Sequence, residues 1–286
     1  MERILVVVGN TIRGILHRRI LYLWIAGMGL VALMALPGIL LSFGNEAVRN
    51  VMRQQTVVSG LDTWSSLCIG LAIFMGATAI GYEKGAKTLT AVFARPIRRW
   101  EFLTGKWIGV QIFALLGLAT GLVAAVVIGT YFGAEFDLKI LGLAVALSAA
   151  AIAVYSALAL ALSTVTHSIL AGALTILFAI LPGFIVLLSE SPNPMTHGAG
   201  VALDLVVPPG YSSHYEDVIH ASIPFEAFMA GRGRIDRRRE LPEFPSQRRE
   251  PDIEYYREFG IFFQNIAYSI AFWALGCLVF SSRELR

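Results

Sequence analysis

The sequence predicts an all-α integral membrane protein with six transmembrane helices, an N-terminal interfacial helix and both termini in the cytoplasm. Of its 286 residues, 56% are hydrophobic and only 15% are charged, with a mean hydropathy of +0.66. Soluble chains carry roughly a quarter charged residues. The high apolar content excludes an intrinsically disordered chain, and two cysteines exclude a disulfide-rich secreted domain. The placement of the charges then predicts each element.

Long segments without charge predict the spans. No Asp, Glu, Lys or Arg occurs in 20–45, 63–82, 107–134, 140–189 or 259–282. A bilayer core about 30 Å thick requires roughly 20 apolar residues of helix. Four segments therefore fit one crossing each, while 140–189 fits two, with a reversal at the polar residues 164–168. We predict spans at about 21–43, 62–82, 107–131, 140–163, 169–189 and 260–280.

The segment before the first span has helical amphipathicity. Residues 2–19 place aliphatic side chains on one helical face and polar side chains opposite: Ile4, Val8, Ile12 and Ile15 against Arg3, Asn10, Arg13 and His17. This pattern is typical of a helix that lies in the plane of the membrane surface. The alternative is a polar leader to the first span.

The distribution of Lys and Arg predicts the orientation. Twelve of these residues fall in the N-terminal segment, the 83–106 connection and the C-terminal tail, against three in the short connections on the other side. Connections rich in Lys and Arg stay in the cytoplasm. We therefore expect both termini and 83–106 in the cytoplasm, and the long 190–258 loop outside.

The 190–258 loop is the most charged part of the chain. It contains eight arginines and twelve acidic residues, and residues 232–258 are also rich in proline. This composition predicts an extended, solvated segment, and the nearly balanced charge argues against a nucleic-acid partner. No function follows from this loop.

The sequence contains no pattern that predicts catalysis. Residues 81–88, GYEKGAKT, look like a phosphate-binding loop, but Ala86 separates Gly85 from Lys87, and an apolar span precedes the segment instead of a strand. No predicted span carries a charge at mid-depth, which disfavours a proton path. We expect no catalytic, metal or cofactor site in this chain.

Small residues within the spans predict close approach of helices. Gly117 and Gly121 are spaced as in helix pairs that pack tightly in lipid. The alternative is that Gly and Ala are simply common in membrane helices.

The cytoplasmic 83–106 connection, EKGAKTLTAVFARPIRRWEFLTGK, is long, basic and partly apolar. Residues 87–94 predict a short helix that ends before Pro96, and a second helical segment begins near Trp100 and leads into the third span. Such a segment favours docking on a partner protein. The alternative is a loop that binds anionic lipid headgroups.

This connection resembles the signature of ABC-2 type transporter permeases, particularly the six-helix single-subunit permeases of the gliding-motility and copper-maturation type. The matching residues are Glu83, Thr88-Leu89, Pro96, Arg99 and Gly105-Lys106, and the tail 280–285 (FSSREL) resembles the closing residues of the family. Two features depart from the pattern: Lys87 replaces a common glycine, and the 190–258 loop is long and highly charged.

The resemblance implies that 83–106 contains a coupling helix seated on a separate ABC ATPase subunit, which binds ATP and Mg²⁺. It implies that this chain is not an enzyme and that it exports a substrate across the bacterial plasma membrane, as a homodimer or with a similar permease. Residues expected to shape the contact with the ATPase are Glu83, Thr88, Leu89, Pro96, Arg98, Arg99, Gly105 and Lys106. Two alternatives are a membrane anchor or assembly factor and, disfavoured by the absence of buried charges, a secondary transporter.

Overall fold

The computed structural model describes residues 2–17, 22, 24–31, 33, 46–85, 97–131, 138–189, 198, 200, 203, 207–208 and 255–282. Its helices are α1 (Glu2–His17), α3 (Glu46–Gly85), α5 (Arg99–Tyr131), α6 (Leu138–Val165), α7 (Ser168–Ser189) and α11 (Tyr255–Ser282). Residues 22, 24–31 and 33 are also helical. The described residues contain no strand, in agreement with the predicted all-α class.

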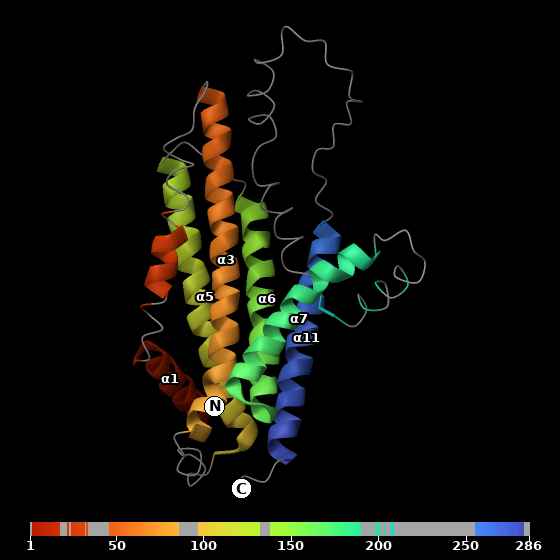
Figure 1. Ribbon diagram of the computed structural model, residues 1–286. Coiled ribbons are helices and arrows are strands. Elements are labelled where there is room, and N and C mark those ends of the chain that lie inside the picture. The colour runs from red at the N-terminus through yellow and green to blue at the C-terminus, as the bar shows by residue number, and fades with distance from the viewer. Residues whose placement is uncertain are drawn as a thin grey trace.

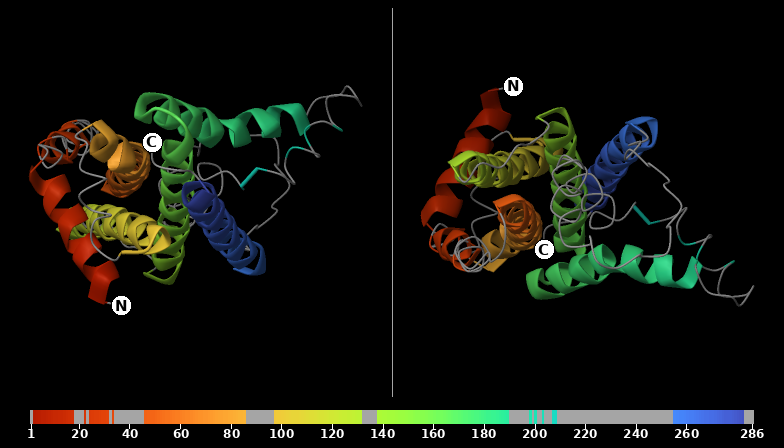
Figure 2. Two further views of the ribbon diagram at one scale, coloured as in Figure 1. Left: turned by 90° about the horizontal axis from the view of Figure 1, so that it is seen from below. Right: turned by 90° about the horizontal axis from the view of Figure 1, so that it is seen from above.

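The long helices form a bundle around α6. Helices α3, α5, α6 and α11 stand side by side, α1 lies beside the lower part of α5, and α7 leans away from the bundle (Figure 1). Seen along the bundle, α6 lies between the α3–α5 pair and α11 (Figure 2). Several buried residues of α6 are alanines, whose side chains project little from the helix: 150, 151, 157, 159 and 161. Small side chains allow several helices to approach one helix closely in lipid.

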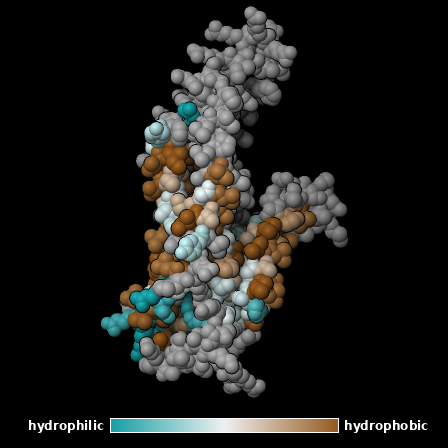
Figure 3. Space-filling model, turned by 60° about the vertical axis from the view of Figure 1, so that its left-hand side comes forward, coloured by the Kyte–Doolittle hydropathy of each residue, from teal (hydrophilic) through white to brown (hydrophobic). Residues whose placement is uncertain are grey.

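Among the described residues, four helices are long and apolar enough to cross a membrane: Ser59–Gly81, Arg99–Tyr131, Leu141–Val165 and Phe259–Ser282. They coincide with four of the predicted spans. The apolar part of α7, Ser168–Pro182, is shorter, and most of the predicted span 21–43 lies outside the described residues. The count of six spans therefore stays a prediction. Apolar side chains cover the flank of the bundle, and hydrophilic ones gather near α1 (Figure 3).

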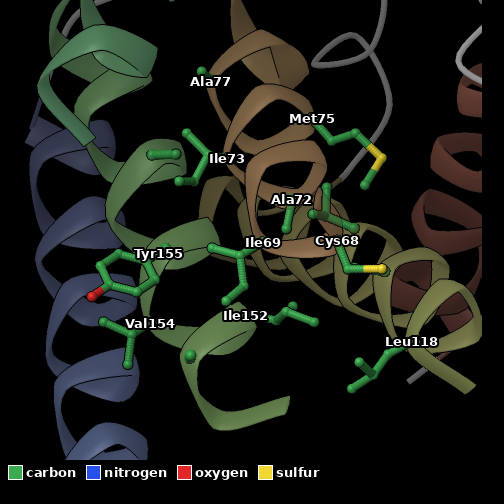
Figure 4. Packing of buried hydrophobic residues seen from close by; sticks show 14 of the residues in the cluster. Cys68, Ile69, Ala72, Ile73, Met75, Ala77, Leu118, Ile152, Val154 and Tyr155 are labelled. Atoms are coloured by element: carbon green, nitrogen blue, oxygen red, sulfur yellow. The ribbon is translucent and has the colours of Figure 1, made fainter. Parts of the chain in front are cut away.

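The main core lies where α3, α5 and α6 meet. Ala72, Ile152 and Leu118 are among its buried side chains (Figure 4). Gly76 is required there, because an added Cβ would lie 2.9 Å from the Ser156 carbonyl oxygen. Ser156 is one polar group of this core that is bonded: its hydroxyl oxygen accepts hydrogen bonds from Gln111 and, at 3.3 Å, from Trp107.

Helix limits extend beyond the predicted spans. The reversal between α6 and α7 lies at Thr166 and His167, as predicted. However, α3 continues to Gly85 and α5 already begins at Arg99, so only residues 86–98 connect them. The charge-free segment marks the crossing of the hydrocarbon core, whereas a helix can continue into the headgroup region. All of 86–96, including the predicted helix 87–94, and most of 190–258 lie outside the described residues.

Several helices begin or end close together at one end of the bundle, which we call the loop end. Val7 of α1, Phe102 at the start of α5 and Phe280 at the end of α11 form one buried cluster. Gly81, near the end of α3, lies against Ser168 at the start of α7. Helix α1 and the last turn of α11 are therefore on the same side, as predicted for the termini. The cytoplasmic assignment of that side stays a prediction.

Candidate functional site

Two of the predicted residues form a buried ion pair at the loop end. Lys106 of α5 contacts Glu83 of α3 through its Nζ atom and the Glu83 Oε1 atom, and the two side chains are only 7% and 11% exposed. The pair joins the helices on either side of the 86–98 connection. Burying two charges costs desolvation energy that their attraction roughly offsets. The Glu83–Lys106 pair therefore fixes the register of α3 and α5 more than it stabilises the fold.

Aromatic rings extend this contact to a third helix. The Lys106 Nζ atom lies 5.5 Å from the centroid of the Phe102 ring, within the range of a cation–π interaction. Phe102 in turn stacks on Phe280 of α11, with ring centroids 6.3 Å apart. The start of α5 thus contacts the end of α11 through two rings.

Arg99 fastens the same two helices with hydrogen bonds. Its Nη1 atom donates to the carbonyl oxygens of Ser281, at 3.0 Å, and Phe280, at 3.4 Å. The last carbonyl groups of a helix lack intrahelical partners and carry partial negative charge. Arg99 therefore caps α11, and its guanidinium group is engaged within this chain.

Arg98 has a different position from Arg99. Its backbone N–H donates to the Glu101 Oε2 atom at 2.9 Å, and its carbonyl oxygen accepts from the Phe102 N–H at 3.1 Å. A Glu three residues into a helix commonly satisfies an N–H at its start in this way. Arg98 itself is exposed. The connection therefore ends at a firmly defined helix start beside an exposed arginine.

Gly105 allows α1 to pack closely against α5, because glycine has no side chain. An added Cβ at Gly105 would lie 2.6 Å from the Val7 Cβ atom, and one at Gly109 would lie 2.8 Å from the Thr11 Cβ atom. Real Cβ atoms essentially never approach so closely. The sequence analysis did not predict this notch, although a spacing of four between two glycines indicates close helix approach.

The remaining predicted residues, Thr88, Leu89 and Pro96, lie outside the described residues. The structure thus brings together Glu83, Arg99, Gly105 and Lys106 at the loop end and places Arg98 at its surface. Sequence reasoning did not connect Phe102 with Phe280, because no spacing rule links positions so distant in the chain.

A second contact joins α3 to α5 inside the bundle. The Trp64 Nε1 atom donates to the Gly117 carbonyl oxygen at 2.9 Å, and an added Cβ at Gly121 would overlap the Trp64 indole ring. The predicted close approach at Gly117 and Gly121 is therefore confirmed, and the residue that fills the notch is a tryptophan of the same chain.

The described part of the loop end combines charged groups and aromatic rings. Within the described ranges, no three His, Cys, Asp or Glu residues lie together to hold a metal ion. The contacts described above link α1, α3, α5 and α11 to one another near the two ends of the 86–98 connection.

Comparison with known proteins identifies the family of the chain. The chain matches the family model described as ABC-2 family transporter protein over residues 20–285, a range that includes the whole loop end except α1. No curated protein matches the chain. Matched over nearly its full length, the chain belongs to the ABC-2 transporter family and is a membrane permease of an ABC-type transporter.

Proposed function

We propose that this permease is the membrane subunit of an exporter in the bacterial plasma membrane, driven by a separate ABC ATPase subunit. ATP and Mg²⁺ bind to the ATPase, and this chain contributes neither a nucleotide site nor catalysis. Two permease chains, identical or similar, form the transport path. The loop end faces the cytoplasm, and the ATPase docks on the connection between α3 and α5.

The proposal rests on the contacts that hold both ends of this connection against the bundle. The Glu83–Lys106 pair makes the end of α3 and the start of α5 move together. Arg99 and Phe102 link the same start to α11. A displacement of the connection by the ATPase would therefore move three helices as one body, as rigid-body switching requires.

The signature residues divide into two groups in this proposal. Glu83, Arg99, Gly105 and Lys106 have partners within the chain, so they position the connection without touching the ATPase. The exposed Arg98, together with Thr88, Leu89 and Pro96, supplies candidates for direct contact. An arginine suits such a contact because its guanidinium group binds carboxylates in a bidentate manner.

Co-purification tests the proposal directly. We expect the tagged permease, extracted in mild detergent, to retain an ABC ATPase subunit and to support ATP turnover. Pro96→Ala and Arg99→Glu should lower both the retained ATPase and the turnover. Lys139→Glu reverses one charge at the start of α6, away from the loop end. It is the matched control and should lower neither the retained ATPase nor the turnover.

Two results would overturn the proposal. If folded Pro96→Ala and Arg99→Glu variants retain the ATPase and its turnover fully, the connection does not couple. If no ABC ATPase is retained by the wild-type permease under any extraction condition, the alternative of a membrane anchor or assembly factor is favoured instead.

A further inference from the structure

A hollow of about 620 Å³ opens at the loop end between the start of α5 and the last turns of α11. Its walls combine basic and apolar side chains: Ile97, Arg98, Arg99, Trp100, Cys277, Leu278 and Ser281. Capping of α11 accounts for Arg99. It does not account for Trp100, which is 43% exposed, or Leu278, which is 70% exposed.

The lengths of the helices place this hollow at the membrane surface. Helix α5 has 33 residues, or about 50 Å at 1.5 Å per residue, whereas the hydrocarbon core is about 30 Å thick. Its first turns therefore extend beyond that core. The apolar stretch of α11 ends at Ser282, so both walls reach headgroup depth. Tryptophan is enriched at this depth because its ring is amphipathic.

An apolar surface leads from the hollow toward the middle of the membrane. On α11, Ala271, Leu275 and Leu278 are exposed and follow one another at intervals of four and three residues. Residues at these intervals share one face of a helix. This face begins at the hollow and continues along the lipid-facing side of α11, where an acyl chain can lie.

We propose that the hollow binds an anionic phospholipid of the membrane. The phosphate contacts the exposed guanidinium group of Arg98, the Trp100 ring lies at the level of the glycerol backbone, and one acyl chain follows Leu278 and Leu275. Charge complementarity selects this occupant, because guanidinium groups form strong paired hydrogen bonds with phosphate. The lipid site goes beyond the proposed coupling to an ATPase: in the isolated permease, Arg98, one of the candidates for contact with the ATPase, binds the lipid phosphate.

Native mass spectrometry of the purified permease, without any ATPase, tests this site. The protein is incubated with equimolar phosphatidylglycerol and phosphatidylcholine that carry the same acyl chains. We expect the wild type to retain phosphatidylglycerol preferentially, because its headgroup has a net negative charge whereas the choline group of phosphatidylcholine neutralises the phosphate. Arg98→Gln removes the cation that senses this difference and should lower the preference about tenfold. Lys139→Gln removes one positive charge at the start of α6, far from the loop end, and should leave the preference unchanged.

A second variant separates the headgroup from the acyl chain. Leu278→Gln should lower retention of both lipids, and it needs no change at Arg98. Each variant is first compared with the wild type by gel filtration and thermal unfolding, and both changed side chains are exposed, so folding should be preserved.

Three outcomes would overturn the lipid site. The first is an unchanged lipid preference in Arg98→Gln, and the second is an equal loss in Lys139→Gln, which would indicate a general charge effect. The third is full displacement of the lipid by inorganic phosphate at millimolar concentration, which would assign the hollow to a free anion. None of these outcomes affects the proposed coupling function, because the ATPase is absent from the experiment.

Discussion

Two of the contacts between helices α3 and α5 rest on different kinds of interaction. At the loop end, the Glu83–Lys106 ion pair holds them through charge. Inside the bundle, Trp64 fills the notch at Gly117 and Gly121 and donates one hydrogen bond. Both contacts link the same pair of helices, so they can be compared directly.

The two contacts separate the source of stability from the source of register. Within lipid, helices gain nothing from the hydrophobic effect, so shape fit and hydrogen bonds hold them together; Trp64 and its notch supply both. A buried ion pair adds little net stability but becomes costly when one partner is lost. The ion pair at the connection therefore sets the alignment of α3 with α5, whereas the Trp64 contact supplies more of the stability.

Removing one charge of the pair should have the largest effect. Lys106→Met leaves Glu83 buried without its cation and should lower the free energy of unfolding by about 3–5 kcal/mol. Reversible unfolding in mixed detergent–dodecyl sulfate micelles measures this change. The double variant with Glu83→Gln should recover most of the loss. A loss below about 1 kcal/mol in the single variant would show that the pair is not buried in the folded protein.

Filling the glycine notch should have the next largest effect. Gly121→Ala forces a methyl group into the Trp64 ring and should cost about 1–3 kcal/mol by the same measurement. Gly70→Ala on α3, where an added Cβ meets no atom within 4 Å, is the control and should be neutral or slightly stabilising. Equal behaviour of the two variants would show that the notch is not tightly filled.

The hydrogen bond within that notch should contribute less than the shape fit. Trp64→Phe keeps an aromatic ring but loses the donor to Gly117, so we expect a loss of about 0.5–1.5 kcal/mol. Trp24→Phe is the matched control: its indole N–H is buried and has no acceptor in the part of the chain that the structure describes. If both changes cost the same, the ring sizes and not the hydrogen bond determine the effect.

The smallest effect is expected at the exposed start of α5. Glu101→Ala removes the acceptor for the Arg98 N–H and should cost at most about 1 kcal/mol, as for other caps. A thermal melt should show a small decrease in midpoint, and Glu101→Gln, which keeps an acceptor oxygen, should restore most of it. A larger decrease than that of Trp64→Phe would mean that the start of α5 contributes more than capping.

Much of the fold can be predicted from the sequence. The charge-free segments have the length that a bilayer requires, and the polar residues before Ser168 mark the turn between two helices. The resemblance also pointed to Glu83, Arg99 and Lys106. Their roles within the chain were not predictable, because pairing across helices depends on the rotation and register of α3 and α5. The cap that Arg99 provides for α11 joins positions 182 residues apart, which no local pattern connects.

We propose that the Glu83–Lys106 pair aligns the connection through which the ATPase would drive this permease. ATP turnover of the assembled complex, measured for Glu83→Lys, for Lys106→Glu and for the double variant that exchanges the two charges, tests this role of the pair. We expect each single variant to lose most of the turnover and the exchanged pair to recover a large part of it. Full turnover in the folded single variants, or no recovery in a folded and assembled double variant, would contradict the claim.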